Sequence, residues 1–115
     1  MIEEIIDKDK AMFQRTLAKS VHVTGVGLHS GERVALTLHP AVENSGISFR
    51  RTDLSGEQGQ VITLSPFLIN DTRLSSTVVT ENGVRVATIE HIMSALAAYG
   101  IDNALIELNA PEIPI

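Results

Sequence analysis

The Asn82-Gly83 pair is the feature of this sequence that most constrains its fold. Asn-Gly is the strongest short-range hairpin signal, because both residues tolerate the positive φ angles of a tight two-residue turn. Strand-like residues precede the pair at 74–80 and follow it at 84–87. The second strand leads directly into residues 88–99, the one stretch with clear helical periodicity. The sequence therefore predicts a hairpin that delivers the chain into a single helix.

The segment 88–99 is predicted to form an amphipathic helix. We expect Thr88 to be its N-cap and Gly100 to end it. Small residues (Ser94, Ala95 and Ala98) occupy the face where charged side chains would be usual, so we expect a ligand, another domain or another chain to cover that face. The core-facing stripe follows the i, i+3, i+4, i+7, i+8 pattern and comprises Ile89, Ile92, Met93, Leu96 and Ala97.

The other predicted elements are short strands separated by turn residues, which indicates an α+β fold. We expect a mostly antiparallel sheet packed with helices in a two-layer sandwich. Residues 1–12 are predicted to be an N-terminal extension, of which 1–11 are poorly ordered or weakly helical. Ser65-Pro66 predicts a brief helical turn. The expected strands, read from alternation and turn signals, are within 13–24 and at 33–39, 47–51, 60–64 and 104–108.

The glycine-rich segment 25–32 connects two of these strands. It lacks the Lys-Ser/Thr ending and the glycine spacing of phosphate-binding loops. Two interpretations stay open, a plain hairpin connection and a part of a functional site. The arginines Arg50, Arg51 and Arg73 also allow two interpretations, as phosphate ligands or as solvated charges at strand ends.

Composition excludes several classes of function. A chain of 115 residues makes one domain. Its net charge of -5 and its few aromatic residues argue against nucleic-acid binding, which needs a basic face or a stacking platform. The absence of cysteine excludes disulfides and thiolate sites. No stretch approaches the roughly 18 apolar residues of a membrane span, and no secretory signal is recognisable, so we expect a cytoplasmic protein.

Glu90 and His91 are the candidate chemical residues. Both fall in the first turn of the predicted helix, where the backbone dipoles favour an ionised carboxylate and a neutral imidazole. These are the states that a general base and a metal ligand need. The alternative is that His91 is only a cap or a satisfied polar residue. A catalytic zinc site generally takes three protein ligands, and the remaining histidines show no ligand spacing, so these residues alone indicate at most half of a metal site.

Six motifs in order resemble the N-terminal half of the UDP-3-O-acyl-N-acetylglucosamine deacetylase (LpxC) family. The resemblance runs from about Phe13 to the last residue. The motifs are residues 14–17, 24–31, 49–54, 88–96, 100–103 and 109–115. This resemblance implies a zinc-dependent amidase of lipid A synthesis in Gram-negative bacteria, which removes the acetyl group from a UDP-linked acylated glucosamine.

The resemblance also implies roles for individual residues. His91 matches a zinc ligand, Glu90 matches the general base that takes a proton from water, and His29 matches a residue that lines the site near the substrate. Residues 74–77 resemble a small inserted sheet that approaches the acyl chain. The family has two similar α+β domains with the active site between them, so residues 13–115 would be the N-terminal domain of such an enzyme.

The family's other two zinc ligands and its general acid belong to the second domain, which this chain lacks. We therefore expect the chain alone to be inactive, to bind zinc weakly or not at all, and to expose an apolar patch that causes self-association. The stiff, apolar segment 109–115 suggests a truncated chain. The alternatives are a stand-alone, non-catalytic module that binds a sugar nucleotide or a protein, and complementation by a separate chain that carries the missing ligands.

Overall fold

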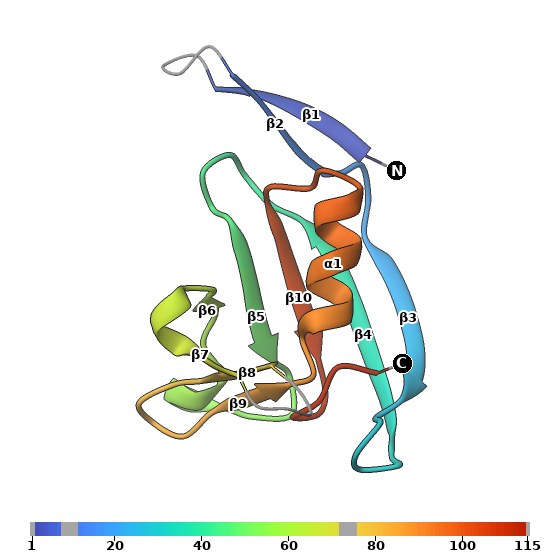
Figure 1. Cartoon of the computed structure of the whole chain (residues 1–115), viewed down its shortest axis with the longest axis vertical. Helices are drawn as coiled ribbons and strands as arrows, with labels where there is room; N and C mark the ends of the chain where they lie inside the picture. Colours follow the sequence, from blue (N-terminus) through green and yellow to red (C-terminus); the bar gives the residue numbers. More distant parts are fainter. Residues whose placement is uncertain (1, 8–11, 72–75, 115) are drawn as a thin grey trace.

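Strand β10, Ala104–Leu108, is the centre of the main sheet in the computed structural model, which describes residues 2–7, 12–71 and 76–114 (Figure 1). The sheet has five strands in the order β3-β4-β10-β5-β6. β10 pairs antiparallel with β4 and parallel with β5. The other members of this sheet are β3 (Val21–Val26), β4 (Arg33–Pro40), β5 (Ile47–Arg51) and β6 (Ile62–Thr63).

A single α-helix within the described residues, α1 (Glu90–Ala98), lies across one face of this sheet (Figure 1). The pleat of β10 sends alternate side chains to opposite faces, and Ala104, Ile106 and Leu108 are buried. The register places Ile106 opposite Phe49, and both are fully buried. The helix adds Leu96 to the same core. The predicted α+β character and mostly antiparallel sheet are confirmed, with the β5-β10 pair as a parallel exception.

A smaller antiparallel sheet carries the predicted hairpin. It has the order β7-β8-β9, with β7 at Ile69–Asp71, β8 at Ser76–Val79 and β9 at Arg85–Ala87. Gly83 has a φ of 85°, and its N–H donates to the Thr80 carbonyl at 3.0 Å. The predicted hairpin is thus confirmed, but Asn82 does not share the positive φ of Gly83, and the Thr80 N–H donates to the Val84 carbonyl, so the turn is not of the two-residue type. Arg73 and the beginning of the predicted strand, up to residue 75, lie outside the described residues.

The C-terminus of α1 is closed as predicted. Gly100 has a φ of 68°, the left-handed conformation that glycine adopts without a Cβ penalty. The Gly100 N–H donates to the Ala97 carbonyl at 3.0 Å, and the Ile101 N–H donates to the Leu96 carbonyl at 2.9 Å. This pair of bonds is a Schellman motif, which satisfies carbonyls that the helix end leaves open.

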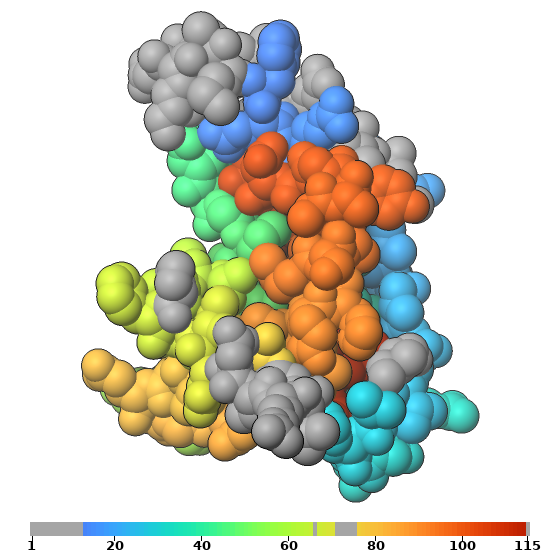
Figure 2. All heavy atoms as spheres, in the orientation of Figure 1, coloured from blue at the N-terminus to red at the C-terminus, as the bar shows by residue number. Residues whose placement is uncertain are grey.

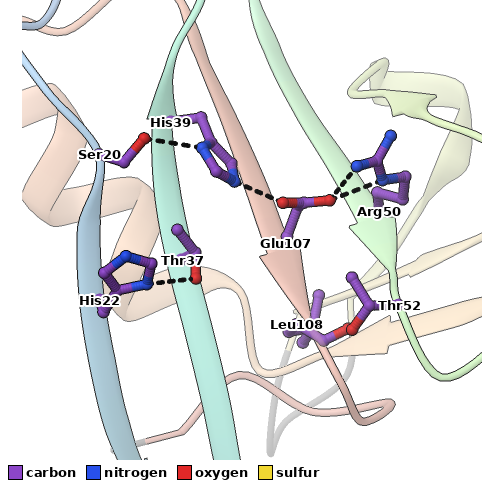
Figure 3. A network of polar contacts seen from close by, with 8 residues as sticks. All are labelled: Ser20, His22, Thr37, His39, Arg50, Thr52, Glu107 and Leu108. Atoms are coloured by element: carbon purple, nitrogen blue, oxygen red, sulfur yellow. Dashed lines mark hydrogen bonds and ion pairs between the residues drawn. The ribbon is translucent and has the colours of Figure 1, made fainter.

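A chain of polar contacts crosses the sheet face that points away from the helix (Figure 3). Glu107 lies at its centre: the Arg50 Nε donates to Glu107 Oε2 at 2.7 Å, and the His39 ring contacts Oε1. Ser20 contacts the other ring nitrogen of His39 at 2.8 Å. Burial raises the pKa of Glu107, but the hydrogen bonds and charges of Arg50 and His39 outweigh that effect and lower it. The network therefore joins β4, β10 and β5 through side chains.

Both arginines of the Arg50-Arg51 pair are engaged with carboxylates. Arg50 pairs with Glu107, and the Arg51 Nη2 lies 2.5 Å from Asp53 Oδ2. The charges at this strand end are therefore ion-paired rather than simply solvated.

The prediction that residues 1–11 are poorly ordered or weakly helical is wrong for residues 2–7. Residues Ile2–Asp7 form strand β1, which pairs antiparallel with β2 (Met12–Leu17) from Ile2↔Leu17 to Asp7↔Met12. The isoleucines of this segment are β-branched and favour extended backbone. Strand β2 supplies the backbone partners with which the segment pairs. The sequence pattern did not predict this strand, because apolar and polar residues do not alternate strictly along it.

The segment 60–68 and helix residue Ala97 differ in part from the predictions. The strand expected at 60–64 is reduced to Ile62–Thr63, and the helical turn at Ser65-Pro66 is confirmed as the 3₁₀ helix η2 (Pro66–Leu68). A second 3₁₀ helix, η1, spans Gly56–Gly59. Ala97 was expected in the core stripe but is exposed, because the buried side of the helix follows Ile89 and Leu96. No helix in the described ranges is long and apolar enough to cross a bilayer.

Phe49→Ala is expected to lower the free energy of unfolding by about 3–5 kcal/mol, because it opens a cavity against Ile106 in a dense core. Urea denaturation measures this loss. Phe67→Ala is the matched control, since Phe67 is 96% exposed and its removal should change stability by less than about 0.5 kcal/mol. Equal losses for the two variants would contradict the assigned core.

The lowered pKa of Glu107 predicts an acid-dependent loss of stability. A carboxyl group whose pKa is lower in the folded state stabilises the fold above its ordinary value of 4.5, and this contribution disappears as the pH falls through the folded pKa. Glu107→Gln should therefore reduce the difference between the unfolding free energies measured at pH 7 and pH 3. An unchanged difference would show that the Arg50 and His39 contacts have no energetic weight.

Candidate functional site

The start of helix α1 differs from the prediction. The N-cap position is Ile89, without a side-chain cap bond, and the predicted cap Thr88 has a φ of 62°. Thr88 is buried, and its hydroxyl donates to Glu112 Oε2 at 3.3 Å. The N-cap prediction is therefore wrong, because a distant carboxylate takes the hydroxyl that would have capped the helix. A left-handed conformation is unusual for a β-branched residue, and the surrounding contacts must hold it.

Glu90 is the first residue of the helix and is anchored to the small sheet. Its Oε2 accepts the Ser76 N–H at 3.0 Å, and the Ile89 N–H donates to the Ser76 carbonyl at 3.1 Å. Glu90 lines a hollow of about 280 Å³ with apolar neighbours, namely Leu64, Ile69, Ile89 and Met93. The structure therefore presents one fixed carboxylate to a small apolar hollow.

His91 follows Glu90 but faces another hollow. Successive helical residues project about 100° apart, and His91 lines an apolar groove of about 430 Å³. His91 is exposed, and helix α1 lies open along the molecular surface in Figure 2. The small residues predicted to need a cover are exposed as well; their covering stays a prediction. The other residues along the groove are Val23, Leu36, Leu38, Ile92, Ile113 and Pro114.

His29 lies in the connection between β3 and β4, which the structure confirms as a hairpin connection. The His29 side chain is exposed, whereas its backbone N–H donates to Glu112 Oε2 at 3.0 Å. The next N–H, that of Ser30, donates to Glu112 Oε1 at 3.2 Å. The connection is therefore a hairpin turn that also binds a carboxylate.

Glu112 is the residue at this site that sequence reasoning missed. It is only 5% exposed, and it contacts the turn at 29–30 and Thr88. Burial raises the pKa of Glu112, but its bonding partners lower that pKa by more. These partners are the Ser30 and His29 N–H groups, the electrostatic attraction of His29 and the Ser30 hydroxyl. The signal available in the sequence was a single acidic residue within the largely apolar segment 109–115.

The structure brings three predicted motifs together at one end of the sheet. The Ala87 N–H donates to the Pro111 carbonyl at 2.7 Å, and the Ile113 N–H donates to the Ala87 carbonyl at 3.0 Å. Gly27 forms a β-bridge with Pro114. The glycine-rich connection, the helix start and the last described residues are thus one structural unit.

The described residues contain no group of three or more His, Asp or Glu side chains positioned to hold a metal ion. The exposed imidazole of His91 could supply one ligand to zinc. A catalytic zinc site needs three protein ligands, so His91 alone does not complete one. Further ligands would have to come from outside the described part of this chain.

Comparison with known proteins identifies the sequence. A family model described as "LpxC: UDP-3-O-acyl N-acetylglycosamine deacetylase" matches residues 14–115. The UDP-3-O-acyl-N-acetylglucosamine deacetylase of Neisseria meningitidis serogroup C is 85% identical over 104 residues, which cover 90% of this chain. The corresponding proteins of Chromobacterium violaceum and Haemophilus influenzae are 60% and 52% identical over 90% and 89% of the chain.

The chain spans about a third of the length of these relatives, 33–34% in each case. The matched residues include all the motifs that meet at the end of the sheet. On this evidence the chain belongs to the LpxC family of UDP-3-O-acyl-N-acetylglucosamine deacetylases.

Proposed function

We propose that this chain is the N-terminal half of a zinc-dependent deacetylase that hydrolyses the N-acetyl group of UDP-3-O-acyl-N-acetylglucosamine in lipid A biosynthesis. The match over residues 14–115 and the printed names of the relatives support the reaction. The observation that carries the proposal to the site is the exposed imidazole of His91, which follows the anchored carboxylate of Glu90 at the start of helix α1. Residues 13–115 would form one α+β domain of a two-domain cytoplasmic enzyme.

Glu90 is assigned the role of general base. Its Oε2 is bonded to the Ser76 N–H, which fixes the carboxylate against β8 and assigns Oε1 to proton transfer. Water gives its proton to Glu90 as its oxygen attacks the acetamide carbonyl carbon. The C–N bond then breaks, acetate leaves, and an acid from outside this chain protonates the amine.

His91 is assigned as one zinc ligand. When bound, zinc would lower the pKa of its water molecule to about 7 and polarise the acetamide carbonyl. This role requires a neutral imidazole with a ring nitrogen free to bind the metal. His29, which lies on the turn held by Glu112, is assigned to the substrate side of the site. Ser76 and Thr77 at the start of β8, which the Ser76 N–H ties to Glu90, belong to the segment that resembles the inserted sheet near the acyl chain, and no specific role is assigned to them.

The remaining two thirds of the relatives' length are assigned the other zinc ligands and the acid. One histidine cannot hold catalytic zinc, so this chain by itself should release no acetate. The apolar groove beside His91 and the open face of α1 would then receive the second domain, or a second copy of this chain when that domain is missing.

A chimaera tests the proposal. The matched 104 residues of this chain replace those of the Neisseria meningitidis enzyme, and acetate release and bound zinc are measured. His91→Ala should lower turnover at least about 100-fold and also lower the zinc content. Glu90→Gln should lower turnover about 10²–10⁴-fold and leave zinc bound, because a general base is lost and no ligand is removed.

His22→Ala is the matched control, since His22 is another exposed histidine, and it lies on β3, bonded to Thr37. Turnover and zinc content should both be unchanged. A folded but inactive chimaera would contradict the proposed reaction. In that event, UDP-sugar binding by the isolated chain would favour a non-catalytic module. Acetate release by the isolated 115-residue chain would contradict the need for a second domain.

A further inference from the structure

We infer that Glu112 is a positioning residue for this reaction, one that ties the His29 turn to the start of helix α1. The inference rests on the proposed function. Glu112 lies at the junction of the two segments that carry the assigned residues, and all of its side-chain bonds that the structure defines go to those segments.

A carboxylate suits this place better than any other side chain. Its two oxygens accept the successive N–H groups of His29 and Ser30 at 3.0–3.2 Å, an arrangement that favours an anion. The Ser30 hydroxyl donates a further bond at 3.3 Å. At 5% exposure an unpaired charge would be costly, whereas these donors make it favourable. The lowered pKa of Glu112 agrees with a permanently ionised group.

Gly27 shows how closely the turn is built around this carboxylate. A Cβ atom at Gly27 would lie 2.2 Å from Glu112 Oε1 and 2.5 Å from Ser30 Oγ. Any other residue at position 27 would have to displace the carboxylate or the Ser30 hydroxyl. The sequence therefore carries a glycine where Glu112 approaches the backbone.

The opposite side of Glu112 is joined to the helix start. Its Oε2 accepts the Thr88 hydroxyl at 3.3 Å, and Ala87 pairs in parallel with residue 112 through its bonds to Pro111 and Ile113. Only Ile89 separates Thr88 from Glu90. A displacement of Glu112 would therefore reach His29 through the turn and Glu90 through the left-handed Thr88. Glu112 itself is assigned no contact with substrate or zinc.

Glu112→Gln in the chimaera is the principal test. The amide keeps the size of the side chain but turns one acceptor into a donor, which faces an N–H of the turn. We expect turnover per bound zinc to fall about tenfold or more, with the zinc content retained because His91 is untouched. A residue that only stabilises the fold would lower the yield of zinc-loaded enzyme and leave turnover per bound zinc unchanged.

Glu107→Gln is the matched control. Glu107 is also a largely buried carboxylate with a lowered pKa, but it lies in the outward-facing network of the sheet. Its replacement should cost stability without changing turnover per bound zinc. Gly27→Ala is the second variant: it displaces the carboxylate without removing it, and it should reproduce the effect of Glu112→Gln even if that variant folds poorly.

The NMR amide signals of the 115-residue chain test directly whether Glu112 binds the His29 and Ser30 N–H groups. The His29 and Ser30 N–H signals should move upfield in Glu112→Gln and stay in place in Glu107→Gln, because only Glu112 accepts bonds from these two N–H groups. Unchanged amide signals, or parental turnover per bound zinc in Glu112→Gln, would overturn the inference. An inactive unmutated chimaera would instead overturn the proposed function, while the amide shifts would still report whether Glu112 holds the turn.

Discussion

The placement of β10 between β4 and β5 is the constraint on which the rest of the structure depends. Its backbone bonds join residues far apart in sequence, and its side chain Ile106 fills the core against Phe49. Such pairing is non-local and requires the whole chain to close on itself. The segment that leaves β10 then passes beneath the helix start, which brings Glu112 to its partners. The strand pairing that builds the core therefore also places Glu112 beside Thr88.

Two carboxylates, the half-buried Glu107 and the buried Glu112, each join separate parts of this fold. Glu107 is held by the cationic side chains of Arg50 and His39, and it joins strands across the outer sheet face. Glu112 is held mainly by backbone N–H groups, and it joins a turn to a helix start. Both have a lowered pKa although burial opposes it, because in each case the donors outweigh desolvation. One arrangement supports the sheet, and the other supports the proposed chemistry.

The proposed function makes this chain one half of a reaction centre. His91 offers a single accessible imidazole on an open helix face, and Glu90 is already fixed by Ser76. The relatives are about three times as long as this chain, and the proposed zinc site needs ligands from that additional length. In that proposal, the fixed carboxylate of Glu90 and the exposed imidazole of His91 are what one side of an interdomain site would present to the other.

The sequence alone determined the features that depend on near neighbours. Gly83 turns the hairpin and Gly100 ends the helix with positive φ angles, and tolerance of such angles is a local property of glycine. The strands at 33–39, 47–51 and 104–108 followed from alternation, and the family followed from motifs in order. The site residues Glu90, His91 and His29 were selected by those motifs, and their roles stay predictions.

Only the tertiary structure decided what depends on distant partners. Thr88 does not cap the helix because Glu112, 24 residues later, takes its hydroxyl. Glu112 went unnoticed because its other partner, His29, lies 83 residues away, and no periodicity records a bond of that span. The strand β1 was missed for the same kind of reason, since pairing with β2 rather than its own pattern makes it extended. Local backbone preference can be read along a chain, whereas the destination of a buried charge is known only once the chain has closed around it.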